Sequence, residues 1–479
     1  MTTLRNGVPD TRRGLTFGYA VSWGVAALGT SLVSGIYGSL LPIFYQDYLG
    51  VRARWIATTS LIYAIWNAVN DPLFGYITDS TRSKLGRRIP YMRYTAPFLA
   101  LTLTHIWLAP SGARDPMIFV WMLVSMLLYD TAYTMIGLVY SALLPEITES
   151  DAERNTLQIA SSLFGLLGTI LGFVIPDLFR PKAGTTPDFL PLQLSMLTAG
   201  VVSAGLIIFT TLRIKERPEF HEVDEPLKLG PAIRYTFTSR SFLVLVAQNF
   251  MSILMQSLLL GGLFYLADYV LQVSAIQLLI WLFIPLLIGV PLTTLIRRRL
   301  GVVGAQQALL VVAGIALLFL AFVPDTLVPV CLAFAGFGLS GPQTLTNVMF
   351  GQVADEDELR SGVRREGAFF GVNALLTKPA QSVALALSPF ILEATGFISR
   401  EANQGRITLD QPAEALFGIR AIVGLIPGAA MLLGALILVA YPLRGETLAE
   451  VKRRLLALHD DKRRRLKTQT DCKQGKSQP

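Results

Sequence analysis

Charged side chains inside apolar stretches are the residues of this sequence most suited to chemistry. Asp71, Asp130 and Lys378 each lie within a run of mostly apolar residues. A charged group in membrane hydrocarbon costs at least about 2.5 kcal/mol, so such residues are usually functional. Asn67 and Asn70 precede Asp71, and Asn67 shares a helix face with it at a spacing of four residues. Carboxylate and amide oxygens together suit a small hard cation, which makes this segment a candidate ion site.

Each of the three charges also has a structural interpretation. Asp71 precedes Pro72, which leaves a helix carbonyl unbonded, so Asp71 could serve only as a local cap at a helix end. Asp130 either lines a cavity, or forms a hydrogen bond between helices or pairs with a base. Lys378 lies about 16 Å into its stretch and needs an acidic partner, for which Asp71 and Asp130 are the candidates. If cation binding at Asp71 competes with such an ion pair, the pair couples the ion to a substrate.

Polar and aromatic neighbours add possible substrate contacts. Thr134 follows Asp130 by one helical turn, and Tyr133 offers an aromatic face on which a sugar could stack. Asn373 lies in the same apolar stretch as Lys378. Amides inside membrane helices are also common packing contacts, and Tyr133 could equally face lipid or the core.

The composition is that of a membrane protein. Of 479 residues, 52% are hydrophobic and 15% are charged, against about 25% charged residues in soluble domains. Two Cys exclude a disulfide scaffold and a cysteine-based metal site, and the three His lie far apart. No nucleophile–base pattern is visible, so the sequence does not predict an enzyme. The net charge of +8 is unevenly spread and does not indicate nucleic-acid binding.

Twelve apolar stretches are long enough to cross a membrane. A hydrocarbon core about 30 Å thick needs about 20 residues of helix. The expected spans are near residues 15–44, 55–79, 91–109, 117–145, 157–179, 190–212, 241–272, 275–296, 302–322, 327–353, 367–392 and 414–442. We therefore predict an all-α membrane protein with two six-helix halves. Their expected bounds are 1–212 and 241–442, with a cytoplasmic linker over 213–240 and a basic cytoplasmic tail over 443–479.

The distribution of basic residues orients these spans. Most of the 41 Lys and Arg residues fall in segments that share one side of the membrane if both termini are cytoplasmic. If the assignment of loops to the two sides of the membrane were shifted by one helix, the excess of Lys and Arg would fall on the opposite side. Because cytoplasmic loops carry an excess of Lys and Arg, the sequence predicts a multi-pass protein of the inner or plasma membrane with both termini in the cytoplasm.

Three charged segments follow spans on this predicted cytoplasmic side. GYITDSTRSKLGRR ends the second span, PEITESDAERNTL the fourth and GQVADEDELRSGVRREG the tenth. Acid–base pairs among them can lock helix ends in one state, so they form a candidate cytoplasmic gate. A solvated run of charges is the alternative. The candidate gate residues are Asp79, Arg82, Arg87, Arg88, Arg154, Asp355, Arg365 and Glu366.

Four motifs connect the chain with a known family. NDPLFGYITDSTRSKLGRRIP, ALLPEITESDAER, ELRSGVRREGAFFGVNALLTKPA and FGIRAIVGLIP resemble segments of the glycoside–pentoside–hexuronide:cation symporter family. The similarity extends over most of the chain. It implies the major facilitator fold and symport of a solute, usually a sugar, with Na+ or H+ and without another cofactor.

The resemblance also assigns roles to individual residues. Asp71 and Asn70 match cation ligands of the family on the second helix, and Thr134 matches a ligand on the fourth. Asn67 stands where the family has a second acid, so the resemblance implies a site with one carboxylate at these positions instead of two. Lys378 matches the family's lysine on the eleventh helix.

A substrate acid of the family is missing here. Gly137 stands where the family's fourth helix has an Asp that holds galactoside hydroxyls, so a galactoside is not implied. The expected function is cation-coupled symport of a sugar or glycoside by alternating access, and an Na+-dependent lysolipid symporter is the alternative. A non-transporting receptor or scaffold would not need charges inside its spans. The expected partners are the solute, the cation and the lipid bilayer, without nucleic acid, and we expect a monomer.

Overall fold

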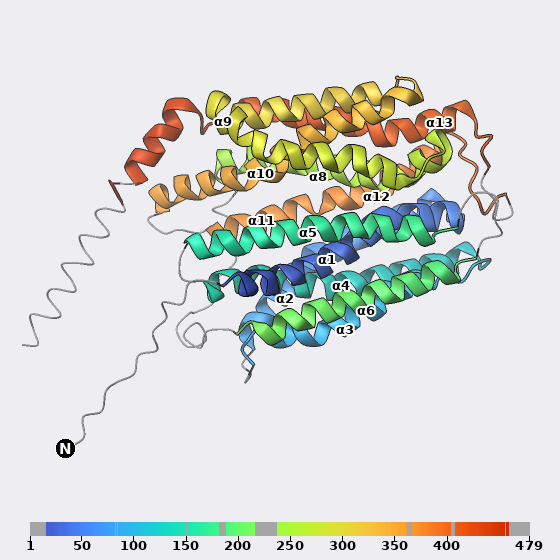
Figure 1. Ribbon diagram of the computed structural model, residues 1–479, viewed down its shortest axis with the longest axis horizontal. Coiled ribbons are helices and arrows are strands. Elements are labelled where there is room, and N and C mark those ends of the chain that lie inside the picture. The colour runs from blue at the N-terminus through green and yellow to red at the C-terminus, as the bar shows by residue number, and fades with distance from the viewer. Residues whose placement is uncertain are drawn as a thin grey trace, which may run out of the picture. The chain divides into compact units, whose positions relative to one another are not determined.

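The computed structural model is a set of helices (Figure 1). It describes residues 16–81, 83, 85–148, 151–181, 188–215, 237–361, 366–403, 408–455 and 457–458. Most of the predicted linker over 213–240, and the tail beyond residue 458, therefore lie outside the described residues. Contacts between Cα atoms group the chain into two compact units. Among the described residues, the first contains 16–51, 65–215 and 399–403, and the second contains 52–64, 237–398 and 408–455.

The first unit is built from the helices of the first half of the chain. Within it, α1 packs against α5 and α6, while α3 packs against α4 and α6. A π-helical turn, η1, extends α1. The elements are α1 (Phe17–Ile43), η1 (Phe44–Tyr48), the later part of α2 (Ala53–Ser80), α3 (Ile89–Ile106), α4 (Asp115–Ile147), α5 (Asp151–Phe179) and α6 (Leu190–Arg213).

Glycines allow α1 and α5 to approach each other closely. A Cβ atom added to Gly172 would lie 2.7 Å from the Leu32 carbonyl oxygen and 2.7 Å from the Cα atom of Gly35. These distances are far below van der Waals contact, so a larger residue does not fit without moving the backbone. Small residues at such crossings let membrane helices pack through their backbones.

The second unit contains the helices of the second half. Within it, α9 packs against α10 and α14, and α8 packs against α12 and α14. The elements are α8 (Arg240–Tyr265), η3 (Leu266–Leu271), α9 (Ala275–Leu320), η4 (Asp325–Leu327), α10 (Val328–Ser361), α11 (Glu366–Thr377), α12 (Pro379–Ala394), α13 (Ala413–Arg420), η5 (Ala421–Leu425), α14 (Ile426–Ile437) and η6 (Leu438–Ala440).

Two backbone interruptions explain how these helices map onto spans. Gly301 has φ 73° within α9, a left-handed conformation that divides this element into two helical segments. The predicted spans near 275–296 and 302–322 lie on either side of it. The predicted span near 367–392 is interrupted at Lys378, because Pro379 has no N–H to continue the hydrogen bonding of α11 into α12.

The helices account for the twelve predicted spans. Within the described part of the chain, nine helical stretches are long and apolar enough to cross a membrane. One of these is α9, which contains two segments, and the more polar α2 and the shorter α3 complete the twelve. Many large apolar side chains are exposed on the helices, among them Leu61, Phe319 and Leu436 at 65%, 59% and 65%. Such surfaces suit contact with lipid.

Candidate functional site

The carboxylate of Asp130 is held by two amide groups of α2. Asp130 lies midway along α4, where its Oδ2 accepts a hydrogen bond of 2.8 Å from the Asn70 side-chain nitrogen. The Asn67 side-chain nitrogen, in the orientation that satisfies its neighbours, lies 3.2 Å from each carboxylate oxygen. All three side chains are buried, with 3%, 0% and 4% exposure for Asp130, Asn70 and Asn67. Two helices of the first unit therefore meet at one acidic group.

The two amide groups supply some of the hydrogen bonds that this buried carboxylate needs. Hydrogen bonds from neutral donors to a charged acceptor are stronger than neutral ones and reduce the cost of burying the charge. The Asn70 side-chain oxygen, in contrast, is buried without a hydrogen-bond partner. Since it belongs to the amide that binds Asp130, this acceptor lies beside the carboxylate. A buried acceptor next to a carboxylate is an arrangement that a cation can complete.

The other predicted cation ligands lie on the same two helices. Thr134 is one turn beyond Asp130 on α4 and is 5% exposed. Asp71 is partly buried and follows Asn70 on α2. Asn67 was expected to share a helix face with Asp71, and the amide of Asn67 is directed at Asp130. Spacing along α2 could not reveal this partner, because it lies on another helix.

A stack of three tyrosines borders Asp130. The rings of Tyr37 and Tyr129 lie 4.5 Å apart between centroids, and those of Tyr129 and Tyr133 lie 5.8 Å apart, all nearly parallel. Tyr133 was a predicted contact, whereas Tyr37 and Tyr129 were not. The spacing of four residues between Tyr129 and Tyr133 is a signal that could have indicated the pair on α4.

Gly137 lies one turn beyond Tyr133 on α4. A Cβ atom added there would meet no other heavy atom within 4 Å. The position at which the sequence lacks an expected acid is therefore open to a larger side chain or a ligand. Together, the stack and this opening form an aromatic wall and a free space on the helix that carries the buried acid.

The predicted residues of the second unit lie near the interruption between α11 and α12. Asn373 accepts a hydrogen bond of 3.0 Å from the side chain of Asn249 on α8. Lys378 is partly buried, and its N–H donates to the Ala374 carbonyl at 3.0 Å. Because Lys378 belongs to the second unit and Asp71 and Asp130 to the first, the ion pair between them stays a prediction.

The candidate gate residues are only partly described. Arg82 and Arg365 lie outside the described residues. Asp79 and Glu366 lie in α2 and α11, with side chains outside the described set. The remaining four are partly buried: Arg87, Arg88, Arg154 and Asp355. Their role as a gate stays a prediction.

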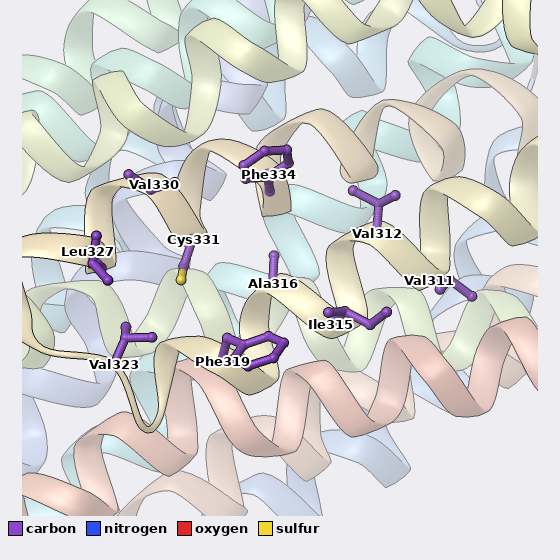
Figure 2. A pocket seen from close by; sticks show the side chains of 10 residues that line it. All are labelled: Val311, Val312, Ile315, Ala316, Phe319, Val323, Leu327, Val330, Cys331 and Phe334. Atoms are coloured by element: carbon purple, nitrogen blue, oxygen red, sulfur yellow. The ribbon is translucent and has the colours of Figure 1, made fainter.

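A groove on the second unit differs in character from the Asp130 cluster (Figure 2). It has a volume of about 390 Å³ and lies between the later segment of α9 and α10. Its lining is aliphatic and aromatic apart from the thiol of Cys331. Solute sites need a few polar groups to fix orientation, so this groove suits hydrocarbon and not a polar solute or an ion. The lining residues are Val311, Val312, Ile315, Ala316, Phe319, Val323, Leu327, Val330, Cys331 and Phe334.

Comparison with known sequences shows the family. Residues 22–445 match the model of a family described as MFS/sugar transport protein. An uncharacterized symporter of Synechocystis sp. is 25% identical, with 92% of this chain and 97% of that protein covered. A sodium-dependent lysophosphatidylcholine symporter of Xenopus tropicalis is 23% identical (89% and 87% covered). An isoprimeverose transporter of Lactiplantibacillus pentosus is 24% identical (84% and 84% covered).

Solved structures show the same fold. A bacterial homologue of the human lysosomal transporter Spinster superposes with a TM-score of 0.63 at 13% identity, covering 93% of this chain and 99% of that one. A D-xylose–proton symporter gives a TM-score of 0.60 at 13% identity, with 88% and 97% covered. Both similarities support the twelve-helix major facilitator fold. The chain therefore belongs to the MFS/sugar transport protein family, the glycoside–pentoside–hexuronide:cation symporters of the major facilitator superfamily, and is a multi-pass membrane transporter, not an enzyme.

Proposed function

We propose that this protein moves a sugar or glycoside together with Na+ or H+ by alternating access. A symporter of this family requires a solute and a coupling ion. The observation that supports the proposal is the buried Asp130 carboxylate, bound by two α2 amides and bordered by stacked tyrosines. Transporters commonly hold substrate and ion near the middle of the membrane. Asp130 is midway along α4, so one cluster supplies groups for both.

We assign the cation to the oxygen atoms of this cluster. The Asp130 carboxylate supplies charge, and the side-chain oxygen of Asn70 is a buried acceptor that needs a partner. Asp71 and Thr134 complete the assigned ligands, while Asn67 orients the Asp130 carboxylate through its amide. Hard oxygen ligands suit Na+. H+ would instead bind a carboxylate directly, and the experiment below separates the two ions.

We assign the solute to the aromatic side of the same cluster. The parallel rings of Tyr37, Tyr129 and Tyr133 form an apolar wall beside a charged acceptor, and Gly137 leaves open space on the same helix. Apolar walls with a few polar groups are typical of small-molecule sites. The isoprimeverose transporter among the relatives supports a sugar as the solute class. Asn373 would add an amide from the second unit.

A lysolipid is the second candidate solute. Lysophosphatidylcholine symporters of frog and chicken are 23% and 22% identical to this chain, close to the 24% of the sugar transporter. The specific observation that favours a lipid is Gly137, where an open position replaces an acid that could hold sugar hydroxyls. The Asp130 cluster would then keep its role with the cation, and the apolar tail would need a separate surface.

The topology and coupling follow from the same proposal. Both termini lie in the cytoplasm, because the basic loops then share that side. The charged segments after the second, fourth and tenth spans form the cytoplasmic gate. Lys378 couples the ion to the solute by pairing with Asp71 or Asp130 when the cation is absent. The protein works as a monomer, since each chain holds all of these groups.

Uptake by proteoliposomes tests the proposal. The purified protein is reconstituted and supplied with labelled glycosides, pentoses, uronides and lysolipids under an imposed Na+ or H+ gradient. We expect one sugar or glycoside to accumulate under one of the two gradients and not after the gradient is dissipated. Accumulation of a lysolipid alone would support the second candidate. Uptake that is equal with and without both gradients would refute symport.

A further inference from the structure

The apolar groove between α9 and α10 ends beside a pair of opposite charges. Figure 2 shows Val311 and Val312 near one end of the groove and Val323 and Leu327 near the other. Asp325 lies between these last two residues in sequence, in the connection that joins the two helices. Because both helices are candidate membrane spans, this connection lies at a membrane surface and the groove lies along the hydrocarbon.

Arg420 supplies the positive charge at this end of the groove. From α13, its Nη1 atom donates to the Leu320 carbonyl at 3.1 Å and to the Val323 carbonyl at 2.8 Å, and its Nη2 atom donates to the Asp325 carboxylate. A guanidinium has five N–H donors, so these three hydrogen bonds leave two donors unused within the described part of the chain. The Asp325 side chain is 57% exposed and that of Arg420 is 15% exposed. Both charges can therefore contact a ligand.

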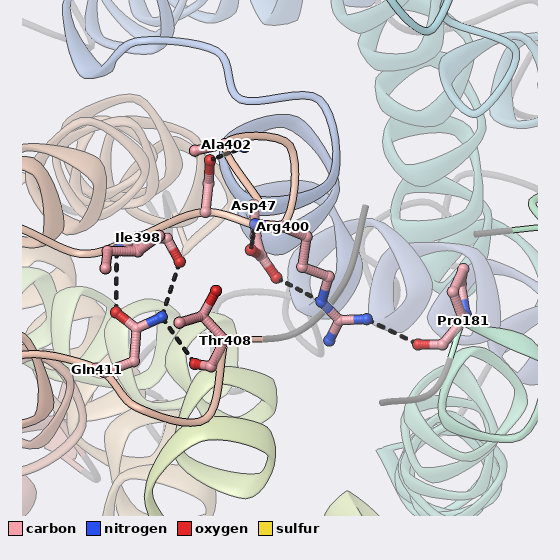
Figure 3. Close-up of polar contacts among 8 residues, drawn as sticks. Asp47, Pro181, Ile398, Arg400, Ala402, Thr408 and Gln411 are labelled. Carbon is pink, nitrogen blue, oxygen red and sulfur yellow. Dashed lines mark hydrogen bonds and ion pairs between the residues drawn. The ribbon is translucent and has the colours of Figure 1, made fainter. Parts of the chain in front are cut away.

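Arg400 shows what an inaccessible pair looks like in the same protein (Figure 3). Its Nε atom lies 2.9 Å from Asp47 Oδ2, and its Nη1 atom donates to the Pro181 carbonyl at 2.8 Å. Its guanidinium carbon lies 4.4 Å from the centre of the Tyr48 ring. Side-chain exposure is 3% for Arg400 and 0% for Asp47. That pair is closed to any ligand, in contrast to the accessible charges beside the groove.

The dimensions of the groove suit one hydrocarbon chain of a lipid. Val311 and Phe319 are eight residues apart on α9, about 12 Å along a helix. The chain beyond Phe319 extends the lining to Val323. One leaflet contributes about 15 Å of hydrocarbon, half of the total thickness. An acyl chain that fills the groove would therefore bring its headgroup to Asp325 and Arg420.

We propose that this groove binds a bilayer glycerophospholipid of the ethanolamine type, with one acyl chain in the groove and the headgroup on Arg420 and Asp325. The lipid phosphate accepts hydrogen bonds from the Arg420 guanidinium, a group well suited to phosphate. The ammonium group of the lipid donates to the Asp325 carboxylate. A choline headgroup has no N–H to donate, and an anionic headgroup without an amine leaves Asp325 without a cationic partner in the lipid.

The lipid site is independent of the proposed symport. The groove belongs to the second unit, whereas the Asp130 cluster belongs to the first. Binding of the lipid needs no gradient and no transported solute, so it is measured on the purified protein at equilibrium. A failure of symport would leave the result of that measurement unchanged.

Native mass spectrometry tests the choice of headgroup. Delipidated protein in detergent is titrated with phosphatidylethanolamine, phosphatidylcholine or phosphatidylglycerol that carry the same acyl chains. We expect the first ethanolamine lipid to bind about tenfold more tightly than either of the others, the factor expected for one charge-assisted hydrogen bond. Asp325→Asn removes the negative charge, keeps the carbonyl contacts of Arg420 and should abolish this preference. Equal affinities for the three lipids in the wild type would overturn the proposal.

Fluorescence quenching tests the location of the lipid. Phe319→Trp places an indole in the groove, and Leu436→Trp places one at an exposed position of α14 outside it. In phosphatidylcholine vesicles with a minor fraction of phosphatidylethanolamine brominated on its acyl chains, we expect stronger quenching of the Phe319→Trp variant. The signal of the six native Trp residues is subtracted with wild-type protein.

A filled groove provides the matched control for both measurements. Ala316→Phe adds a ring to the groove lining, and Leu436→Phe adds one elsewhere on the lipid-facing surface. Only Ala316→Phe should weaken binding of the ethanolamine lipid and remove the excess quenching. Equal quenching of the two Trp variants would overturn the location. Dimers whose formation does not depend on lipid would also overturn it, because a second copy of the chain would then cover the groove.

Discussion

Replacement of Asp130 by Asn removes a charge from the candidate site and nearly preserves the shape of the side chain. The hydrogen bonds from Asn67 and Asn70 would then have a neutral acceptor. A hydrogen bond to a charged group contributes about 1.5–3 kcal/mol and a neutral one about 0.5–1.5 kcal/mol, a loss of about 1 kcal/mol per donor. Burying a neutral amide costs less than burying a carboxylate, which offsets this loss. We therefore expect little change in thermal stability.

The effect of Asp130→Asn on cation binding is larger. A unit charge 4 Å from a cation contributes about 4 kcal/mol at an effective dielectric constant of 20. Since about 1.4 kcal/mol corresponds to a factor of ten, the apparent affinity for the cation should fall by about 1,000-fold. Accumulation driven by the cation gradient should then disappear.

The assay measures the cation concentration that gives half-maximal uptake in proteoliposomes. Asp115→Asn, in the first turn of the same helix, is the matched control and should leave this concentration unchanged. Asn67→Asp combined with Asp130→Asn moves the carboxylate to the other side of the same contact and should restore cation dependence. Wild-type cation dependence in the Asp130→Asn variant would refute the assignment of the ion to this cluster.

The remaining predictions concern packing, coupling and the tail. Gly172→Ala should destabilise the protein by about 1–3 kcal/mol, because the added Cβ atom would lie 2.7 Å from backbone atoms of α1. Gly137→Ala, where the Cβ atom meets no neighbour, should be tolerated. Thermal unfolding in detergent compares the two variants, and equal unfolding temperatures would contradict the close packing of α1 against α5. Lys378→Ala should keep solute exchange but lose accumulation under a gradient, and normal accumulation would exclude the coupling role. The Arg454 hydrogen bond, with the Arg453 charge, lowers the pKa of Glu450 below 4.5, so its contribution to the helix over 445–455 is present above that pH and is lost as the pH falls through the lowered value. Glu450→Gln should therefore speed proteolysis of this helix at neutral pH but make no difference below the lowered pKa, and equal cleavage of both proteins at neutral pH would contradict this.

The fold was predictable because each span is a long apolar run. The expected spans near 190–212 and 55–79 differ by at most two residues at either end from α6 and α2. Gly301 and Pro379 were visible in the sequence, but only the backbone shows that the first divides α9 and that the second interrupts the helix after Lys378. Local composition determines where a membrane helix can form, and it says less about where a helix is interrupted.

The site was predictable residue by residue but not in its contacts. The position of Asp130 inside an apolar span and the spacing of Asn67 and Asn70 marked all three as functional candidates. Their meeting depends on how α2 and α4 pack, which no pattern within one helix contains. For the same reason Tyr37, on α1, could not be joined to Tyr129 from the sequence.

The close glycine contact between α1 and α5 has a mechanical consequence. Where Gly172 meets Gly35, no side chains lie between the backbones, so no change of rotamer can absorb a small movement of one helix against the other. Close-packed interiors transmit strain. A 27-residue helix is about 40 Å long. The two helices should therefore move together as one rigid body, so that a displacement at one membrane surface is transmitted to the other.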